Sequence, residues 1–161
     1  MGHSAEALEP RLLVAEAPAT AAGFPRGLLV VGGAGDARPG RLAPLATVGF
    51  AFNRSTNRWR RLPAMPGGRS GATMAWTGKR LLVWGGSRTA NGGPPVFALH
   101  GLAYDPKANR WTAFARGPLS GRLDPASVWT GRSLLVWGGE KPRTPLGTGT
   151  LYLADGAGYT P

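Results

Sequence analysis

A short apolar segment that ends in two glycines occurs three times in this chain, at equal spacing. The first glycine of each pair is Gly32, Gly85 or Gly138, so successive copies lie 53 residues apart. The copies read Gly-Leu-Leu-Val-Val-Gly-Gly, Arg-Leu-Leu-Val-Trp-Gly-Gly and Ser-Leu-Leu-Val-Trp-Gly-Gly. Similarity at a period of about 50 residues indicates a repeat architecture in which each repeat forms one small structural unit.

Residues on both sides of the glycine pairs also recur, so the repeat is longer than the apolar segment. The segments 69–78 and 122–131 each begin with arginine, have tryptophan at the eighth position and end in glycine. The segments that begin at Gly49, Gly101 and Gly149 each have an aromatic residue ten positions later, namely Trp59, Trp111 and Tyr159. Four recurring elements in each period predict four short antiparallel strands, as in a propeller blade.

The second repeat shows how these strands are expected to lie. Alternating small and large residues over 72–76 and the apolar run 81–84 predict two strands, and 102–104 and 110–114 predict two more. Glycine pairs at the end of the inner strand allow one backbone to pass close to another. The residues assigned this structural role are Gly32, Gly33, Gly85, Gly86, Gly138 and Gly139.

The tryptophans recur with the repeat, and such regular recurrence predicts that they pack between neighbouring repeats. A carbohydrate site lined by tryptophan is the alternative interpretation. The residues given the packing role are Trp59, Trp84, Trp111 and Trp137.

Three further stretches carry a resemblance to a known family. The glycine pairs, the runs Tyr104-Asp105-Pro106 and Asn109-Arg110-Trp111, and Trp59 followed by Leu62-Pro63 resemble kelch repeats, as in bacterial kelch-like and galactose-oxidase-like propellers. The resemblance extends from about residue 20 to residue 161. It implies an all-β fold, a kelch-type β-propeller segment of three four-stranded antiparallel blades.

The expected domain organisation follows from these boundaries. The blades cover about 20–62, 69–114 and 122–161, and the segment 1–19 is either loose or a cap. Propellers usually close with about 4 to 8 blades, so three blades form an arc with two uncovered faces. Three interpretations stay open: a piece of a longer propeller, a homodimer that closes a six-bladed ring, and a monomeric arc.

The chain is strongly basic, with a formal net charge of +11. No acidic residue lies between Asp36 and Asp105, and a field of one sign attracts anionic ligands. The alternative is that the arginines between these two aspartates are exposed to solvent at strand edges, where their charge prevents pairing with another strand. No recognition helix or zinc-finger spacing accompanies the basic residues, so a nucleic-acid partner is not expected. No apolar stretch approaches the roughly 20 residues of a membrane span, and no membrane role is expected.

The first 25 residues show no secretory signal, so the cytoplasm is the default expectation, and a secreted or periplasmic location requires missing upstream sequence. The chain has no cysteine and two histidines, His3 and His100, which lie far apart in sequence. No catalytic residue, metal site or cofactor is therefore expected, and copper-oxidase chemistry of the kelch-like type, which requires a cysteine, is excluded.

Function is expected on the face where the long connections lie, because recognition usually resides in loops on a rigid scaffold. These connections include 34–48, 87–98 and 140–148. The candidate ligand-binding residues are Arg69, Arg88, Arg122 and Lys141. For the two that precede strands, the alternative is that they bond loop carbonyls and orient the start of each blade. The sequence predicts a non-catalytic binding or scaffold module for a protein or an anionic ligand. The alternative is a sugar-handling enzyme of the epimerase or mutarotase type, completed by further blades.

Overall fold

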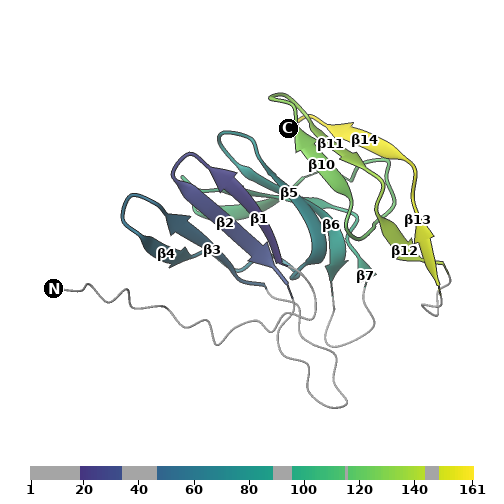
Figure 1. The fold of residues 1–161 in the computed structure, drawn as a ribbon, viewed down its shortest axis with the longest axis horizontal. Coiled ribbons are helices and arrows are strands. Elements are labelled where there is room, and N and C mark those ends of the chain that lie inside the picture. The colour runs from purple at the N-terminus through teal and green to yellow at the C-terminus, as the bar shows by residue number, and fades with distance from the viewer. Residues whose placement is uncertain (1–18, 34–46, 89–95, 115, 144–148) are drawn as a thin grey trace, which may run out of the picture.

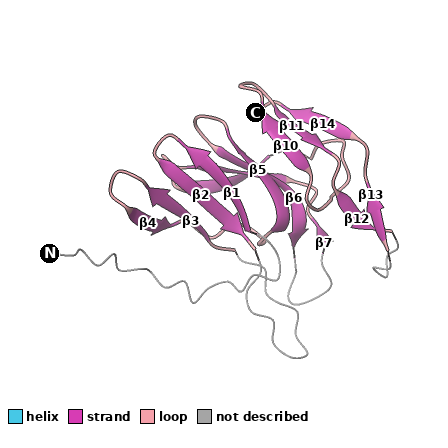
Figure 2. Cartoon of the chain, viewed as in Figure 1, coloured by secondary structure: helices cyan, strands magenta, loops and turns pink. Residues whose placement is uncertain are grey.

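The computed structural model describes residues 19–33, 47–88, 96–114, 116–143 and 149–161, and these residues form strands and turns without any helix. Figure 1 shows the antiparallel sheets following one another along the chain, and Figure 2 shows the same view coloured by secondary structure. The prediction of an all-β fold is confirmed. Since the described residues contain no helix, none of them forms a helix that could cross a membrane.

Each repeat forms one main sheet. The first sheet has four strands in sequence order, β1 (Ala19–Phe24), β2 (Gly27–Gly32), β3 (Gly49–Asn53) and β4 (Arg58–Arg61). The second sheet has the order β5 (Ser70–Trp76), β6 (Leu81–Arg88), β8 (Gly101–Asp105) and β9 (Arg110–Phe114), and the short β7 (Val96–Phe97) pairs with the end of β6. The third sheet contains β10 (Ala126–Trp129), β11 (Leu134–Trp137) and β14 (Gly156–Tyr159). A separate hairpin joins β12 (Glu140–Pro142) and β13 (Thr150–Tyr152).

Strand β6 is buried on both faces, which explains why its sequence is a continuous apolar run rather than an alternating one. Leu81 and Val83 pack against the first sheet, in a cluster that also holds Leu29 of β2. Leu82 and Trp84 point the other way and pack against the third sheet. The core of the protein therefore lies between successive sheets.

The glycine pairs bring neighbouring sheets into backbone contact. All six glycines have positive φ angles, between 65° and 93°. The amide of Gly33 donates a hydrogen bond to the carbonyl of Arg69 at 2.9 Å, and the amide of Gly86 donates to the carbonyl of Arg122 at 2.8 Å. A Cβ atom at Gly86 would lie 2.7 Å from the carbonyl oxygen of Ser70. Backbone therefore lies close to backbone at these glycines.

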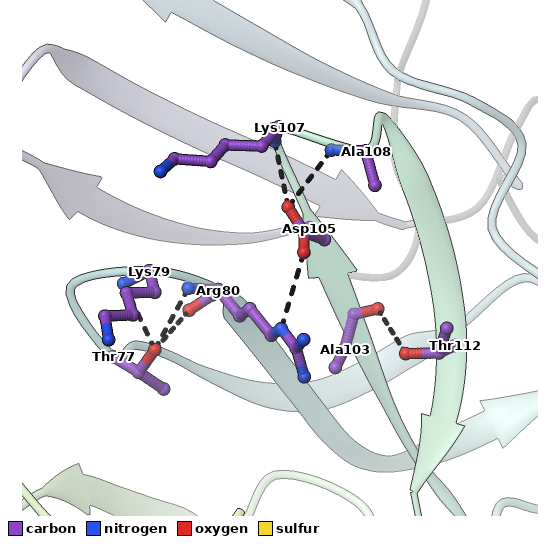
Figure 3. A network of polar contacts seen from close by, with 8 residues as sticks. All are labelled: Thr77, Lys79, Arg80, Ala103, Asp105, Lys107, Ala108 and Thr112. Atoms are coloured by element: carbon purple, nitrogen blue, oxygen red, sulfur yellow. Dashed lines mark hydrogen bonds and ion pairs between the residues drawn. The ribbon is translucent and has the colours of Figure 1, made fainter.

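Polar side chains hold the tight turns, as Figure 3 shows for the second sheet. The carboxylate of Asp105 accepts hydrogen bonds from the amides of Lys107 and Ala108, at 2.9 and 3.2 Å. The hydroxyl of Thr77 accepts a hydrogen bond from the amide of Arg80 at 3.0 Å. The backbone hydrogen bonds from Ala108 and Lys107 lower the pKa of Asp105, and Arg80 contributes to the same shift. Asp105 thus stabilises the turn that follows β8.

The third repeat departs from the expected four strands, because its described main sheet has three. Tyr159 pairs with Leu134 in β11, as Tyr104 pairs with Leu81 in β6. Tyr159 is therefore the equivalent of Tyr104, and aligning it with Trp111 was wrong. The cause is the β12–β13 hairpin, which takes up residues expected in the third strand, so that β14 occupies that place instead.

Among the four tryptophans expected to pack between repeats, the two of the second repeat lie in or beside the core clusters. Trp84 is 5% exposed within the second core cluster, and Trp111 packs at the edge of the first cluster and donates from Nε1 to the carbonyl of Pro63. Trp59 and Trp137 are 42% and 62% exposed. These two lie on the first and last sheets, on the faces that no sheet of the described residues covers.

We expect Gly86→Ala to destabilise the protein more than Gly78→Ala does. Both glycines have positive φ, which costs a residue with a Cβ about 1–2 kcal/mol. Only Gly86 also brings the new methyl group against backbone, since nothing lies within 4 Å of a Cβ at Gly78. Overpacking should add about 1–3 kcal/mol at Gly86, measured by urea unfolding. Equal losses in the two variants would contradict the close-approach role.

Candidate functional site

Arg69 and Arg122, which the sequence proposes as ligand-binding residues, lie inside the protein. Arg69 is 4% exposed and Arg122 is 0% exposed. The guanidinium of Arg69 donates to the carbonyl of Gly85 at 2.9 Å, and that of Arg122 donates to the carbonyl of Gly138 at 3.0 Å. Each arginine therefore holds the first glycine of the pair in its own repeat. This is the arrangement of the alternative interpretation, in which these arginines bond loop carbonyls.

The two arginines complete a chain of contacts across the three sheets. The backbone carbonyl of each accepts from the second glycine of the preceding repeat, while its guanidinium donates to the first glycine of its own repeat. We call this series the arginine–glycine chain; its members are Gly33, Arg69, Gly85, Gly86, Arg122 and Gly138. It satisfies buried backbone groups that would otherwise destabilise the fold.

The surroundings of Arg122 neutralise its charge. Its guanidinium donates to both carboxylate oxygens of Asp155, at 2.6 and 3.1 Å, and to the carbonyl of Ser120 at 3.0 Å. The guanidinium carbon also lies 5.9 Å from the ring centroid of Trp84. Hydrogen bonding to Arg122 lowers the pKa of Asp155, so the carboxylate is charged at neutral pH. The bidentate pair fixes the start of the third sheet.

Arg69 has no carboxylate partner among the described residues. Its second guanidinium nitrogen donates to the carbonyl of His100 at 2.9 Å, and its Nε has no hydrogen-bond partner in the described structure. Burial, together with the nearby charge of Arg88, lowers the pKa of Arg69 to about 10. The guanidinium is therefore still charged at neutral pH, although it is held by carbonyl oxygens alone.

The other two predicted ligand-binding residues lie beside undescribed segments. Arg88 ends β6 and is exposed, and Lys141 lies within β12 and is half-buried. Most of each long connection, including 34–46, 89–95 and 144–148, lies outside the described residues, as do the segment 1–18 and His3. Ligand binding by Arg69, Arg88, Arg122 and Lys141 stays a prediction. The described residues include no cluster of side chains suited to a metal ion.

A cavity of about 420 Å³ lies between the first and second sheets, at the edge formed by the tight turns. We call it the turn-edge groove. Arg26 and Arg58 line it from the β1–β2 turn and the start of β4, and Arg60 lines it from the same face of β4 as Arg58. No aspartate or glutamate of the described part of the chain lines the groove. The aromatic residues along it are Phe24, Phe52, Trp59 and Tyr104.

The three arginines of the groove differ in their hydrogen bonds to the described residues. Arg60 donates to the side-chain oxygen of Asn109 at 3.0 Å and to the hydroxyl of Tyr104 at 3.1 Å. The hydroxyl of Tyr104 donates in turn to Asn109 at 2.8 Å. The side chains of Arg26 and Arg58 form no hydrogen bond or ion pair with the described residues. The groove therefore combines two available guanidinium groups with an aromatic border.

Sequence reasoning did not find this groove, although it noted the run of arginines. A period of two in β4 places Arg58 and Arg60 on one face and Trp59 on the other, and this signal was available in the sequence. The second wall comes from Tyr104 and Pro106 of the next sheet. That wall follows from the packing of the sheets, which the sequence does not specify residue by residue.

No family model matches this chain, and no curated protein sequence does either. Among solved structures, the chain is similar to that of YjhT, with a TM-score of 0.67 and 21% sequence identity. The similarity covers 89% of this chain and 51% of YjhT. This chain therefore spans about half the length of that structure, and at this identity the likeness concerns the fold alone.

We expect Arg69→Met and Arg122→Met to lower the free energy of unfolding by about 2–5 kcal/mol each, because each leaves buried carbonyl oxygens without donors. Arg132→Met, at an exposed turn position with the same charge change, should stay within about 0.5 kcal/mol of the parent. Urea unfolding followed by tryptophan fluorescence measures all three. Unchanged stability of both buried variants would show that the arginine–glycine chain does not hold the sheets.

Proposed function

We propose that this chain is a kelch-type β-propeller segment that acts as a non-catalytic binding module. Three repeats of equal period, successive four-stranded antiparallel sheets in the first two, and face-to-face packing between the sheets support the propeller assignment. The scaffold is rigid where it is described, because each pair of sheets shares a core cluster and the arginine–glycine chain.

The ligand in this proposal is an acidic group of a protein or another anion, and the turn-edge groove is where it binds. The single observation that supports this site is that Arg26 and Arg58 line one groove in which, among the described residues, neither has a partner and no carboxylate is present. Guanidinium groups bind carboxylate and phosphate through paired hydrogen bonds. Phe24 borders the groove and offers apolar contact to the rest of the ligand.

The volume of the groove suits a side chain or a small ligand rather than a folded surface. Cavities that hold small ligands are usually about 300–1,000 Å³, and this groove has about 420 Å³. Arg60 is tied to Tyr104 and Asn109, so its guanidinium is fixed in place before any ligand arrives. A preorganised cation binds at a lower entropic cost than a free one does.

The chain as a whole strengthens this preference through its charge. A formal net charge of +11 draws anions toward the surface from every side. Such a field does not distinguish one site from another, so the specific contribution of the groove has to be measured against the same loss of charge elsewhere. The third repeat offers two exposed arginines, Arg132 and Arg143, for that comparison.

A fluorescein-labelled hexaglutamate peptide is a suitable probe, with binding followed by fluorescence anisotropy at low salt. We expect the double variant Arg26→Gln with Arg58→Gln to raise the Kd about tenfold or more, since two charge-assisted hydrogen bonds are lost. Arg132→Gln with Arg143→Gln removes the same charge and should change the Kd by about threefold at most. Equal weakening by both pairs, or no binding by the parent protein, would contradict the proposed site.

A further inference from the structure

The first and third sheets each present an exposed apolar face. The equivalent faces of the second sheet are covered by its two neighbours. On the third sheet, Leu135 and Trp137 are 44% and 62% exposed. Their equivalents one repeat earlier, Leu82 and Trp84, are 1% and 5% exposed because the third sheet packs on them. Val128 adds to the same open face and is 56% exposed. We call this surface the last face.

The first sheet carries the complementary surface. Leu28 of β2 pairs with Phe52 of β3, which pairs with Trp59 of β4, so these side chains share one face. The equivalent residues of the second sheet, Leu81 and Tyr104, are fully buried against the first sheet. On the first sheet, Trp59 is 42% exposed. We call this surface the first face.

The contact between neighbouring sheets is repeated within the chain, so it provides a template for how a first face meets a last face. The first sheet packs on the second, and the second packs on the third. In each contact, a face that carries leucine and valine side chains lies against the neighbouring sheet. The same backbone hydrogen bond accompanies both contacts, from Gly33 and from Gly86 to the following sheet. The amide of Gly139, at the corresponding place on the third sheet, has no acceptor among the described residues.

We propose that a second copy of this chain docks head to tail, with the first face of each copy against the last face of the other. Two copies then make two equivalent interfaces and close a ring of six sheets, because a two-fold axis relates the copies. The occupant is a second copy rather than an unrelated protein because its first face repeats the surface that already packs on Leu82 and Trp84 inside the chain.

One contact inside the chain predicts which residues meet across the new interface. The hydroxyls of Thr73 in β5 and Ser127 in β10 lie 2.5 Å apart, across the junction of the second and third sheets. Ala126 pairs with Trp137 as Thr73 pairs with Trp84, so Ala126 is the equivalent of Thr73. Ala21 occupies the place of Ser127 by the same reasoning.

The register of β1 supports this second assignment, since Ala21 pairs with Val30 as Ser127 pairs with Val136. Both alanines are exposed in the single chain. In the closed pair, Ala126 of one copy therefore lies opposite Ala21 of the other, within the separation that a disulfide spans.

Cysteine cross-linking tests this geometry, and the absence of native cysteine gives a clean background. The variant with both Ala21→Cys and Ala126→Cys, oxidised with glutathione disulfide, should run mainly as a covalent dimer on a non-reducing gel. Each single-cysteine variant should stay at the mass of one chain, because identical positions lie on opposite sides of the ring. An equimolar mixture of the two single variants should again give the dimer.

Adding Trp137→Arg to the double-cysteine variant should reduce the cross-linked fraction about tenfold, since it places a charge in the interface. Circular dichroism of that variant checks that the sheets are retained. The proposal is overturned if the double-cysteine variant stays at the mass of one chain, if it forms a ladder of larger species, or if the single variants cross-link equally well. A ladder would indicate open head-to-tail association instead of a closed pair.

Discussion

The chain of contacts between arginines and glycines at the sheet junctions is the interaction on which the rest of this structure depends. Arg69 and Arg122 each join the preceding sheet through a backbone carbonyl and their own glycine pair through the guanidinium. Gly86 at one of these junctions cannot be replaced without a clash, because a Cβ there would meet the backbone. Two residue types that are often assigned to binding sites thus serve first to align the sheets.

This arrangement explains why the core lies between sheets rather than within one layer. Strand β6 offers Leu81 and Val83 to one neighbour, and Leu82 and Trp84 to the other. A sheet of this kind is fully buried only when it has a neighbour on each side. The outer sheets have one neighbour each, so Trp59 and Trp137 remain exposed although their equivalents are packed. The open faces therefore arise from the repeat itself.

Much of the fold followed from the sequence, because the period, the turn residues and the apolar strands all recur. The strand order of the third repeat could not be predicted from the sequence. The β12–β13 hairpin displaces the expected third strand and still leaves an aromatic residue at the expected spacing. For the site, the sequence located Arg69 and Arg122 at the start of each repeat but did not settle whether they face solvent. Their burial depends on carbonyl groups from distant loops, and the turn-edge groove depends on a wall supplied by the next sheet.

In the proposed pair, a second copy supplies the missing neighbour for both end sheets, because sheets of this type are fully buried only between two neighbours. Light scattering on the parent protein, coupled to size-exclusion chromatography, measures whether this pair exists in solution. A single chain has a mass of 16.8 kDa, and the account predicts a uniform species of twice that mass. A monodisperse species at the mass of one chain, unchanged up to high concentration, would contradict it.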